Sequence, residues 1–433
     1  MPARERAILV GVEWKSRSAS HRANTVGMEE SLEELAELAA GAGAEVVGRA
    51  MQTRPGPEAA TLIGQGKVEE LRAQVLSEGA GVLIFDHDLT PTQQRNLEKA
   101  AGCKVIDRTQ LILDIFAARA RTREGRMQVE LAQLSYLLPR LSGHGAQMSR
   151  LGGGIGTRGP GETKLETDRR RIAQRIKKIK DDLEGVRAGR ALHRQRRSAV
   201  PLATLALAGY TNAGKSTLFN RLTRASVLAD ARMFATLDPT VRPLALPSRR
   251  RVLLSDTVGF IRNLPTTLVQ AFRATLEEVK EAALVLHVVD ISAPAAAENT
   301  THVLHVLAEI DAAQIPQILV MNKADRVREG AAANTEAIQR RLLSGSTGHA
   351  AARAVAISAL TGEGIDRLLA AIDEVLPLDP IVRATLHLSA GDGATLALLH
   401  EFGRVLSTRY TGEGCEIEAD IPQSLERRLA TQD

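Results

Sequence analysis

The sequence predicts an α/β chain of four successive parts: an N-terminal parallel α/β domain, an antiparallel helical hairpin, a doubly wound α/β domain and a small C-terminal α+β domain. Short apolar runs alternate with helical segments over residues 1–122 and again over 199–378, which is typical of parallel sheets covered by helices. Between them, over 123–198, apolar residues recur every three or four positions. Pro377 and Pro380 mark the boundary of a last segment, 379–433. A chain of 433 residues is long enough for about two to four domains.

The first part alternates strand-like and helix-like segments. The apolar runs expected as strands are 7–12, 45–51, 82–85 and 104–107. The segments expected as helices are 28–42, 67–77, 90–101 and 109–120. Pro91 supports the third helix, because proline is favoured in the first helical turn. We therefore expect one parallel sheet with helices on its faces.

The second part has the apolar spacing of two helices joined by a loop. In the first stretch the apolar positions are Met127, Leu131, Leu134 and Leu138. A glycine-rich stretch at 142–161, with Arg150 and Arg158, separates it from the second. The second stretch repeats a similar rhythm at Leu165, Ile172, Ile176, Ile179, Leu183 and Val186. Each helix would bury its apolar stripe against the other in an antiparallel hairpin.

The third part again reads as a doubly wound α/β domain. Its apolar runs, expected as strands, are 202–208, 252–255, 283–290, 317–321 and 354–357. The fourth part is expected to be a small α+β unit with one helix around 395–406.

Charge and cysteine content indicate the class of protein. The net charge is +5, and the stretch 163–197 alone holds 13 Lys/Arg against 5 Asp/Glu, as expected for a surface that meets phosphates. Cys103 and Cys415 have neither a disulfide pattern nor metal-ligand spacing, so we expect thiols in a reducing compartment, the cytoplasm. No stretch approaches the ~20 apolar residues of a membrane span, so any membrane association would be peripheral.

Residues 209–216 match the phosphate-binding P-loop pattern. They read Gly-Tyr-Thr-Asn-Ala-Gly-Lys-Ser, follow an apolar run and open a helical segment, which is the context that such a loop requires. The glycines let backbone amides curl around phosphates. Lys215 should reach the β- and γ-phosphates, and the Ser216 hydroxyl should bind Mg²⁺. Thr217 would add a hydroxyl near the α-phosphate.

A second motif selects the base. Residues 322–325, Asn-Lys-Ala-Asp, follow the run that ends at Met321. The Asp325 carboxylate can accept hydrogen bonds from the ring N–H and the amino group of guanine, whereas adenine has no such donors there and would leave a buried carboxylate without a partner. The motif therefore favours GTP over ATP.

The segment 256–259, Asp-Thr-Val-Gly, also follows a strand. Asp256 should hold Mg²⁺ through water, and the Gly259 amide should sense the γ-phosphate, so that the following segment reorders on hydrolysis. Between this motif and the P-loop, residues 234–240 contain two threonines, and one of them should bind Mg²⁺ when the γ-phosphate is present. Spacing alone does not separate Thr236 from Thr240.

Phe260 stands where many G-proteins have a glutamine that orients the attacking water. An aromatic hydrocarbon ring cannot hydrogen-bond that water. The backbone, another side chain, a cation or a partner must therefore position it. We expect slow basal turnover that a partner stimulates.

Taken together, these motifs resemble the bacterial HflX family of translation GTPases. The resemblance includes residues 159–171, Gly-Pro-Gly-Glu-Thr-Lys-Leu-Glu-Thr-Asp-Arg-Arg-Arg, and the stretch 62–70, and only the last ~50 residues are less diagnostic. It implies Thr236 as the Mg²⁺ threonine, Asn322 as a guanine contact that braces the P-loop, and Lys323 over the base. Residues 358–360 resemble the last guanine motif, in which the amide of Ala359 would meet the guanine oxygen.

The motifs and the resemblance together define the expected site. Lys215, Thr236 and Gly259 are expected to act in catalysis, and Ser216 and Thr236 to bind Mg²⁺. The residues expected to bind GTP or GDP are Gly209, Tyr210, Thr211, Asn212, Ala213, Gly214, Lys215, Ser216, Thr217, Phe234, Ala235, Thr236, Leu237, Asp238, Asp256, Thr257, Val258, Gly259, Asn322, Lys323, Ala324, Asp325, Ser358, Ala359 and Leu360.

The resemblance also implies a partner, the large ribosomal subunit with its RNA and proteins. Members of the family act on stalled or idle ribosomes and split them into subunits. The basic helix at 164–197 fits RNA phosphates independently, with an affinity that should fall as salt rises. We expect a monomer. Two alternatives stay open: an RNA- or stress-related GTPase whose main target is not the ribosome, and a scaffold whose GTPase domain only senses nucleotide.

One further stretch of the first part could hold an anion. Gly64-Gln-Gly66-Lys67 opens a helix, whose N-terminus carries partial positive charge. It lacks the P-loop pattern, so an ordinary helix start or an RNA contact is the preferred interpretation.

Overall fold

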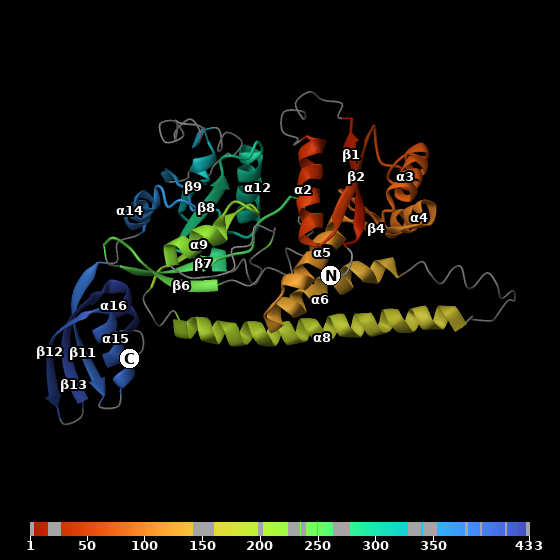
Figure 1. Cartoon of the computed structure of the whole chain (residues 1–433). Helices are drawn as coiled ribbons and strands as arrows, with labels where there is room; N and C mark the ends of the chain where they lie inside the picture. Colours follow the sequence, from red (N-terminus) through yellow and green to blue (C-terminus); the bar gives the residue numbers. More distant parts are fainter. Residues whose placement is uncertain are drawn as a thin grey trace.

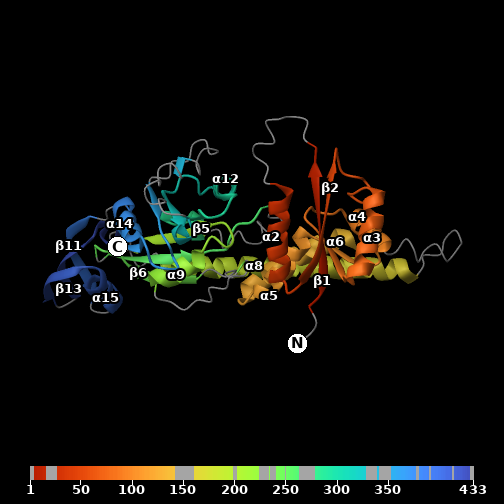
Figure 2. The ribbon, with the colours of Figure 1, turned by 45° about the horizontal axis from the view of Figure 1, so that its top comes forward.

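A computed structural model describes residues 4–15, 27–141, 160–197, 202–223, 234, 240–248, 250–262, 278–327, 339–340, 353–376, 380–389, 392–411 and 414–429. Figures 1 and 2 show three separate sheets and one long helix that runs beside two of them. Within the described ranges, no helix combines the length and the apolar character that crossing a membrane would require.

The first sheet is parallel, as the alternation of segments predicted. Its four strands are β1 (Arg6–Trp14), β2 (Glu45–Arg54), β3 (Val82–Phe85) and β4 (Lys104–Asp107), in the order β2-β1-β3-β4. Helices α2 (Met28–Gly41) and α5 (Arg108–Arg119) cover one face, and α3 (Gln65–Glu78) and α4 (Pro91–Ala101) cover the other.

Alternation along β1 explains how both faces are buried. Ala7 and Leu9 pack with α2 and α5, whereas Ile8 and Val10 pack with α3 and α4. Local sequence also sets the helix ends. The Thr90 hydroxyl accepts the Gln93 amide, and the Gln93 side chain accepts the Thr90 amide, so α4 begins with a capping box.

The hairpin consists of α6 (Arg123–Arg140) and the 38-residue α8 (Pro160–Arg197), which therefore extends well beyond α6. The two helices lie side by side, and Arg175 of α8 makes a bidentate ion pair with Glu130 of α6, at 2.7 and 2.9 Å. Ile179 and Leu183 are buried at the expected stripe positions. Of the expected glycine-rich stretch 142–161, residues 142–159 lie outside the described residues, and 160 and 161 already belong to α8.

The doubly wound domain has a six-stranded sheet in the order β10-β9-β8-β5-β7-β6. Its strands are β5 (Thr204–Gly209), β6 (Thr240–Ala245), β7 (Arg251–Asp256), β8 (Leu284–Asp290), β9 (Gln317–Asn322) and β10 (Arg353–Ala356). Helices α9 (Lys215–Thr223) and α14 (Ile365–Val375) cover one face, and α12 (Ala296–Glu309) covers the other.

Strand β6 was not predicted. It is the one described strand of this sheet that runs antiparallel, and it lies at the edge against β7. Only Leu244 of its six residues is buried, so no apolar run marks it, and Pro243 is acceptable because an edge strand need not donate every amide.

The C-terminal unit is an antiparallel sheet of β11 (Ile381–Ser389), β13 (Gly414–Pro422) and β12 (Arg404–Thr411), in that order, with α15 (Gly393–Phe402) and α16 (Gln423–Leu429). The prediction of a single helix around 395–406 was wrong at its end and in number. The helix ends at Phe402 because Gly403 packs tightly against β13, and residues 404–406 already belong to β12.

Candidate nucleotide-binding site

The loop at 209–216 joins the end of β5 to the start of α9, as its motif predicted. Gly214 has φ +95°, and a Cβ there would collide with the side-chain amide of Asn322. Only glycine meets both conditions, because L side chains are strained at this φ. The chain therefore turns from strand to helix within a few residues, which is the backbone context of an anion-binding loop.

Lys215 is buried beneath this loop. Its Nζ donates to the carbonyl oxygens of Gly209 at 3.0 Å and Tyr210 at 2.8 Å. Burial lowers the pKa of Lys215 to about 8, while the Asp256 carboxylate opposes that shift. A phosphate at this position would raise the pKa of Lys215 again, because an anion close to the amine favours its protonation.

Ser216 and Asp256 come together although they lie 40 positions apart. The Ser216 hydroxyl donates to Oδ2 of Asp256 at 2.9 Å, and Asp256 ends the buried strand β7. A hydroxyl and a carboxylate beside a phosphate loop form a donor set of hard oxygens, which Mg²⁺ prefers. These residues fit that ion.

The side of the site expected to hold the base is braced by Asn322. Its Nδ2 donates to the Ala213 carbonyl at 2.8 Å, and its Oδ1 accepts the Ala359 amide at 2.9 Å. Lys323 has φ +63° and pairs with Asp290 at 2.6 Å. Asp325 follows in the short 3₁₀ helix η2 (Ala324–Arg326) and is exposed, with its carboxylate open to a ligand. One side chain thus links the P-loop to the loop at 358–360.

The segment after Asp256 lies against the P-loop. The Phe260 amide donates to the Gly209 carbonyl at 3.1 Å, and the Phe260 carbonyl accepts the Thr211 amide at 2.7 Å. A Cβ on Gly259 would approach Lys215 Nζ to 3.0 Å and Thr211 to 2.9 Å, so this contact requires glycine. The Phe260 ring is buried with Ala206, Ala208 and apolar residues of α12, which leaves only its backbone at the site.

The structure describes only part of the segment 234–240. Phe234 is buried, and Thr240 is the first residue of β6. Ala235, Thr236, Leu237 and Asp238 lie outside the described residues. The choice between Thr236 and Thr240 as the Mg²⁺ ligand therefore stays a prediction.

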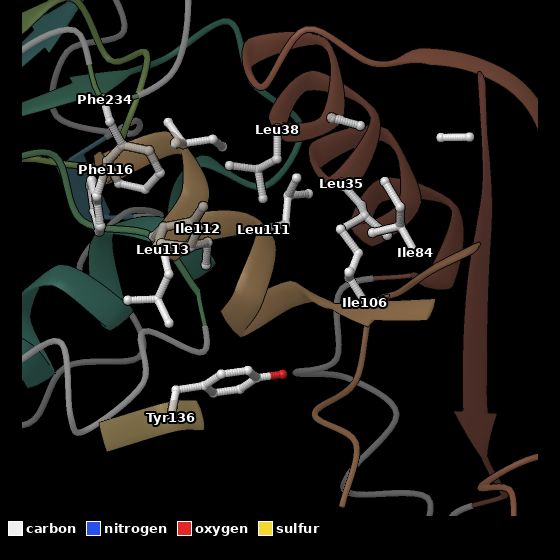
Figure 3. Packing of buried hydrophobic residues seen from close by; sticks show 14 of the residues in the cluster. Leu35, Leu38, Ile84, Ile106, Leu111, Ile112, Leu113, Phe116, Tyr136 and Phe234 are labelled. Carbon is white, nitrogen blue, oxygen red and sulfur yellow. The ribbon is translucent and has the colours of Figure 1, made fainter. Parts of the chain in front are cut away.

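Sequence reasoning missed a contact between this site and the N-terminal domain. Phe234 packs edge-on against Phe116 of α5, with ring centroids 4.5 Å apart, and Figure 3 shows the two rings side by side. Val258 and Ile261 join the same buried cluster. The core that covers one face of the first sheet thus continues into Phe234 and into the 258–261 segment, which is hydrogen-bonded to the phosphate loop.

Polar contacts accompany this apolar one. The Tyr210 hydroxyl donates to Oε1 of Glu34 on α2 at 2.5 Å. A pocket of about 220 Å³ lies beside it, between the glutamates of α2, the P-loop and the start of α12. No local signal in the sequence could have indicated this pairing, because the two residues are 176 positions apart.

His287 was also missed. It lies fully buried on β8, and its Nε2 has no hydrogen-bond partner within the part of the chain that the structure describes. Burial, helped by the nearby Lys215 charge, lowers the pKa of His287 to about 4. The ring is therefore neutral at physiological pH.

Family models match most of the chain. The model described as "GTP-binding GTPase N-terminal" matches residues 29–117, and "GTP-binding GTPase Middle Region" matches 119–197. The model described as "50S ribosome-binding GTPase" matches 204–323, and "Elongation factor Tu GTP binding domain" matches 272–378.

Whole-length relatives agree with these matches. The chain is 46% identical to GTPase HflX of Caldanaerobacter subterraneus subsp. tengcongensis, over 98% of this chain and 93% of that one. It is 43% identical to GTPase HflX of Escherichia coli, over 93% and 92%. A GDP complex of a GTP-binding protein from Sulfolobus solfataricus covers 86% of this chain and 98% of that chain, at 24% identity and a TM-score of 0.45.

Proposed function

The chain belongs to the HflX family of GTPases, and we propose that it uses GTP binding and hydrolysis to act on the large ribosomal subunit, splitting or recycling stalled or idle ribosomes under stress. The GTP hydrolase activity is that of the family, which binds guanine nucleotides. What we propose is the target, the large ribosomal subunit, and the outcome, the splitting or recycling of ribosomes.

The proposal of ribosome binding rests on the exposed basic surface of α8. Arg169, Arg170 and Arg171 are exposed in succession, and Lys177, Lys178 and Lys180 follow on the same helix. A solvated cationic rod of this kind can neutralise RNA phosphates and release their counterions. The match of residues 204–323 to a domain described as ribosome-binding supports the same target.

The nucleotide site supports a mechanism of phosphate binding and charge neutralisation. Lys215 would contact the β- and γ-phosphates, and the amide of Gly259, a residue that lies close to Lys215 Nζ, would contact the γ-phosphate. Ser216 and Thr236 would hold Mg²⁺ directly, and Asp256 would hold it through water. When bound, Mg²⁺ would neutralise charge that develops on the phosphate oxygens.

Guanine would be read on the opposite side of the loop. Asp325 would accept the two donors of the base, and Lys323 would lie over the ring. The Ala359 amide, which donates to Oδ1 of Asn322 in this structure, would donate to the guanine oxygen when the base binds. Asn322 links this side to the P-loop, so base binding and phosphate binding are supported by one brace.

Basal hydrolysis should be slow, because the Phe260 ring is buried away from the phosphates and cannot orient a water. The main chain and the partner would complete the site. This explains why a ribosomal contact would stimulate turnover.

The first test is GTP turnover by the purified chain, with and without purified large ribosomal subunits, at two salt concentrations. We expect stimulation by the subunits that weakens as salt rises. Tight GTP binding without stimulation would indicate that the target is another RNA or a stress-related partner. Nucleotide binding with no turnover in any condition would instead indicate a nucleotide-sensing scaffold.

A charge-reversal variant tests the assignment of α8. Replacing Arg169, Arg170 and Arg171 by glutamate should weaken subunit binding and lower the log–log salt slope by about 2 to 3, if each arginine meets one phosphate. Basal hydrolysis should stay unchanged. The matched control reverses Arg49, Arg72 and Lys99, three exposed cations of the N-terminal domain. Equal loss in both variants would indicate a general charge effect and remove α8 from the interface.

A further inference from the structure

Tyr210 stands in the P-loop, yet its side chain leaves the nucleotide site. Its hydroxyl donates to Glu34 of α2 at 2.5 Å and accepts the backbone amide of Arg262 at 2.9 Å. Arg262 lies three residues after Gly259. The single hydroxyl therefore joins the N-terminal domain to the segment that would sense the γ-phosphate.

The main chain of Tyr210 contacts the other half of the phosphate machinery. Its carbonyl accepts Lys215 Nζ at 2.8 Å, and its backbone forms a parallel bridge with Phe260. The bridge holds Phe260, the residue after Gly259, and the Tyr210 hydroxyl holds Arg262, two residues further along the chain. Tyr210 thus contacts Lys215 and two of the three residues that follow Gly259, Phe260 and Arg262.

The acceptor of the Tyr210 proton is itself fixed. Oε1 of Glu34 lies 3.0 Å from the guanidinium of Arg108, and that guanidinium, whose side chain is only 2% exposed, also pairs with Asp86 at 2.7 Å. Asp86 in turn accepts the Ser31 hydroxyl at 2.6 Å. The contacts of Asp86 with Arg108 and Ser31 are charge-assisted hydrogen bonds, and the contact of Arg108 with Glu34 is an ion pair. Together they restrict the position of the Glu34 carboxylate.

The direction of proton donation is also settled. Burial and the Glu34 charge raise the pKa of Tyr210 well above its ordinary value, so the phenol stays protonated. Since its proton goes to Glu34, its oxygen is left to accept Arg262 N–H. Donation to a carboxylate makes that oxygen a better acceptor, so the two bonds strengthen each other.

We propose that Tyr210 is a positioning residue of the GTPase reaction: its hydroxyl, anchored on Glu34 of the N-terminal domain, holds the 259–262 segment so that the Gly259 amide lies beside Lys215. The inference rests on the proposed roles of Gly259 and Lys215. It assigns to the N-terminal domain a direct part in arranging the γ-phosphate site, through one hydrogen bond.

The deletion of a single oxygen tests this. Tyr210→Phe keeps the ring and should lower the single-turnover rate of GTP hydrolysis about tenfold, the loss expected for one charge-assisted hydrogen bond. The affinity for GDP should change less than about twofold, because GDP lacks the phosphate that the segment would sense. Glu34→Ala, which removes the anchor, should give the same split between hydrolysis and GDP affinity.

The double variant tests whether Tyr210 and Glu34 act through the same contact. Tyr210→Phe with Glu34→Ala should be no slower than either single variant, because both remove the same contact. Tyr136→Phe is the matched control, since it deletes the hydroxyl of a buried tyrosine on α6, and its hydrolysis rate should equal that of the wild type.

Several outcomes would overturn the inference. An unchanged or raised hydrolysis rate in Tyr210→Phe would show that the hydroxyl does not arrange the site. A parallel loss of GDP affinity would show that it only maintains the P-loop fold. Additive losses would separate Tyr210 from Glu34. A wild-type chain without GTP hydrolysis would contradict the proposed function instead, so the two failures are distinguishable.

Discussion

Phe260 stands where many G-proteins have a water-orienting glutamine, and its side chain cannot take that role. Its ring is 3% exposed and packs against Ala206 and Ala208 of β5 and against α12, whereas its amide and carbonyl pair with the P-loop. The side chain therefore anchors the segment in the core, and only the backbone of Phe260 contacts the P-loop. A polar side chain here would lie in an apolar slot without access to a phosphate-bound water.

Substitutions at Phe260 should accordingly affect stability more than chemistry. Phe260→Leu should leave basal GTP turnover within about twofold, and Phe260→Ala should destabilise the GTPase domain by about 3–5 kcal/mol, the usual cost of deleting a buried aromatic ring. Turnover and urea unfolding of both variants check this. A large loss of turnover in the leucine variant, with stability retained, would mean that the ring itself acts in the reaction.

His287 makes the stability of the same domain depend on pH. Its folded pKa is about 4, below the ordinary 6.5, so the unfolded chain binds this proton more readily than the folded one. Its contribution to stability is complete above pH 6.5 and is lost as pH falls toward 4. At about 1.4 kcal/mol per pKa unit, the loss is on the order of 3 kcal/mol.

Replacing the ring by a side chain that does not titrate should remove that part of the pH dependence. His287→Gln should flatten the fall in stability between pH 6.5 and 4, measured by hydrogen exchange of the β8 amides in urea. His305→Gln is the control, because that side chain is 71% exposed. An equally steep fall in the His287 variant would assign the acid sensitivity to other groups.

At the scale of an element, α9 supports the loop at 358–360. Arg221, near the end of α9, donates Nε to the Ala359 carbonyl at 3.2 Å and Nη2 to the Leu360 carbonyl. Asn322 holds the Ala359 amide from the other side. Ala359, the residue expected to meet guanine, is thus held at its N–H by Asn322 and at its C=O by Arg221 of the P-loop helix.

Loss of this support should shorten the residence of the nucleotide. Arg221→Ala should release GDP about three- to tenfold faster with little change in association, since the loss of a contact that supports a binding loop acts mainly on dissociation. Stopped-flow release of a fluorescent GDP measures this. Arg353→Ala, which removes a surface partner of Glu374, should release GDP at the wild-type rate. Equal acceleration in both would point to general loosening of the domain.

At the scale of the whole molecule, the N-terminal and GTPase domains share buried side chains. Phe234, Val258 and Ile261 belong to the same cluster as Leu35, Leu38 and Phe116 (Figure 3). The 258–261 segment is hydrogen-bonded to the P-loop, and Phe234 opens the segment 234–240 that is expected to supply the Mg²⁺ threonine. Any rearrangement of these segments with nucleotide would therefore change a core that both domains build.

Arg108 is the polar centre of that shared region. It is 2% exposed and neutralises two carboxylates, Glu34 and Asp86, so Arg108→Met would leave both buried without their cation. We expect the N-terminal domain to lose about 3–5 kcal/mol of stability. Urea unfolding followed by the fluorescence of Trp14, the only tryptophan of the chain, reports on this domain.

Two controls define the result. Arg6→Met breaks a half-exposed pair with Glu78 and should cost less than about 1 kcal/mol. Adding Glu34→Gln and Asp86→Asn to Arg108→Met should recover part of the loss, because neutral amides replace the uncompensated charges. No difference between the Arg108 and Arg6 variants would show that the buried charges are neutralised in another way.

The sequence by itself determined the local elements and the motif loops. All nine expected strands, such as 82–85 and 104–107, reappear with bounds within three residues, because apolar runs between polar turns signal strands locally. The P-loop was equally readable, since its glycines, lysine and serine are adjacent and their spacing is the signal. The edge strand β6 and the C-terminal strands left weaker signals, because only one of their faces is buried.

Only the tertiary structure decided which distant residues complete the site. Tyr210 and Glu34 are 176 positions apart, and Arg108 and Asp86 meet only because β3 and β4 are neighbours in one sheet. A sequence pattern reports the period of an element and which face it buries. It does not report which other element covers that face, because that choice depends on packing between surfaces brought together from separate parts of the chain.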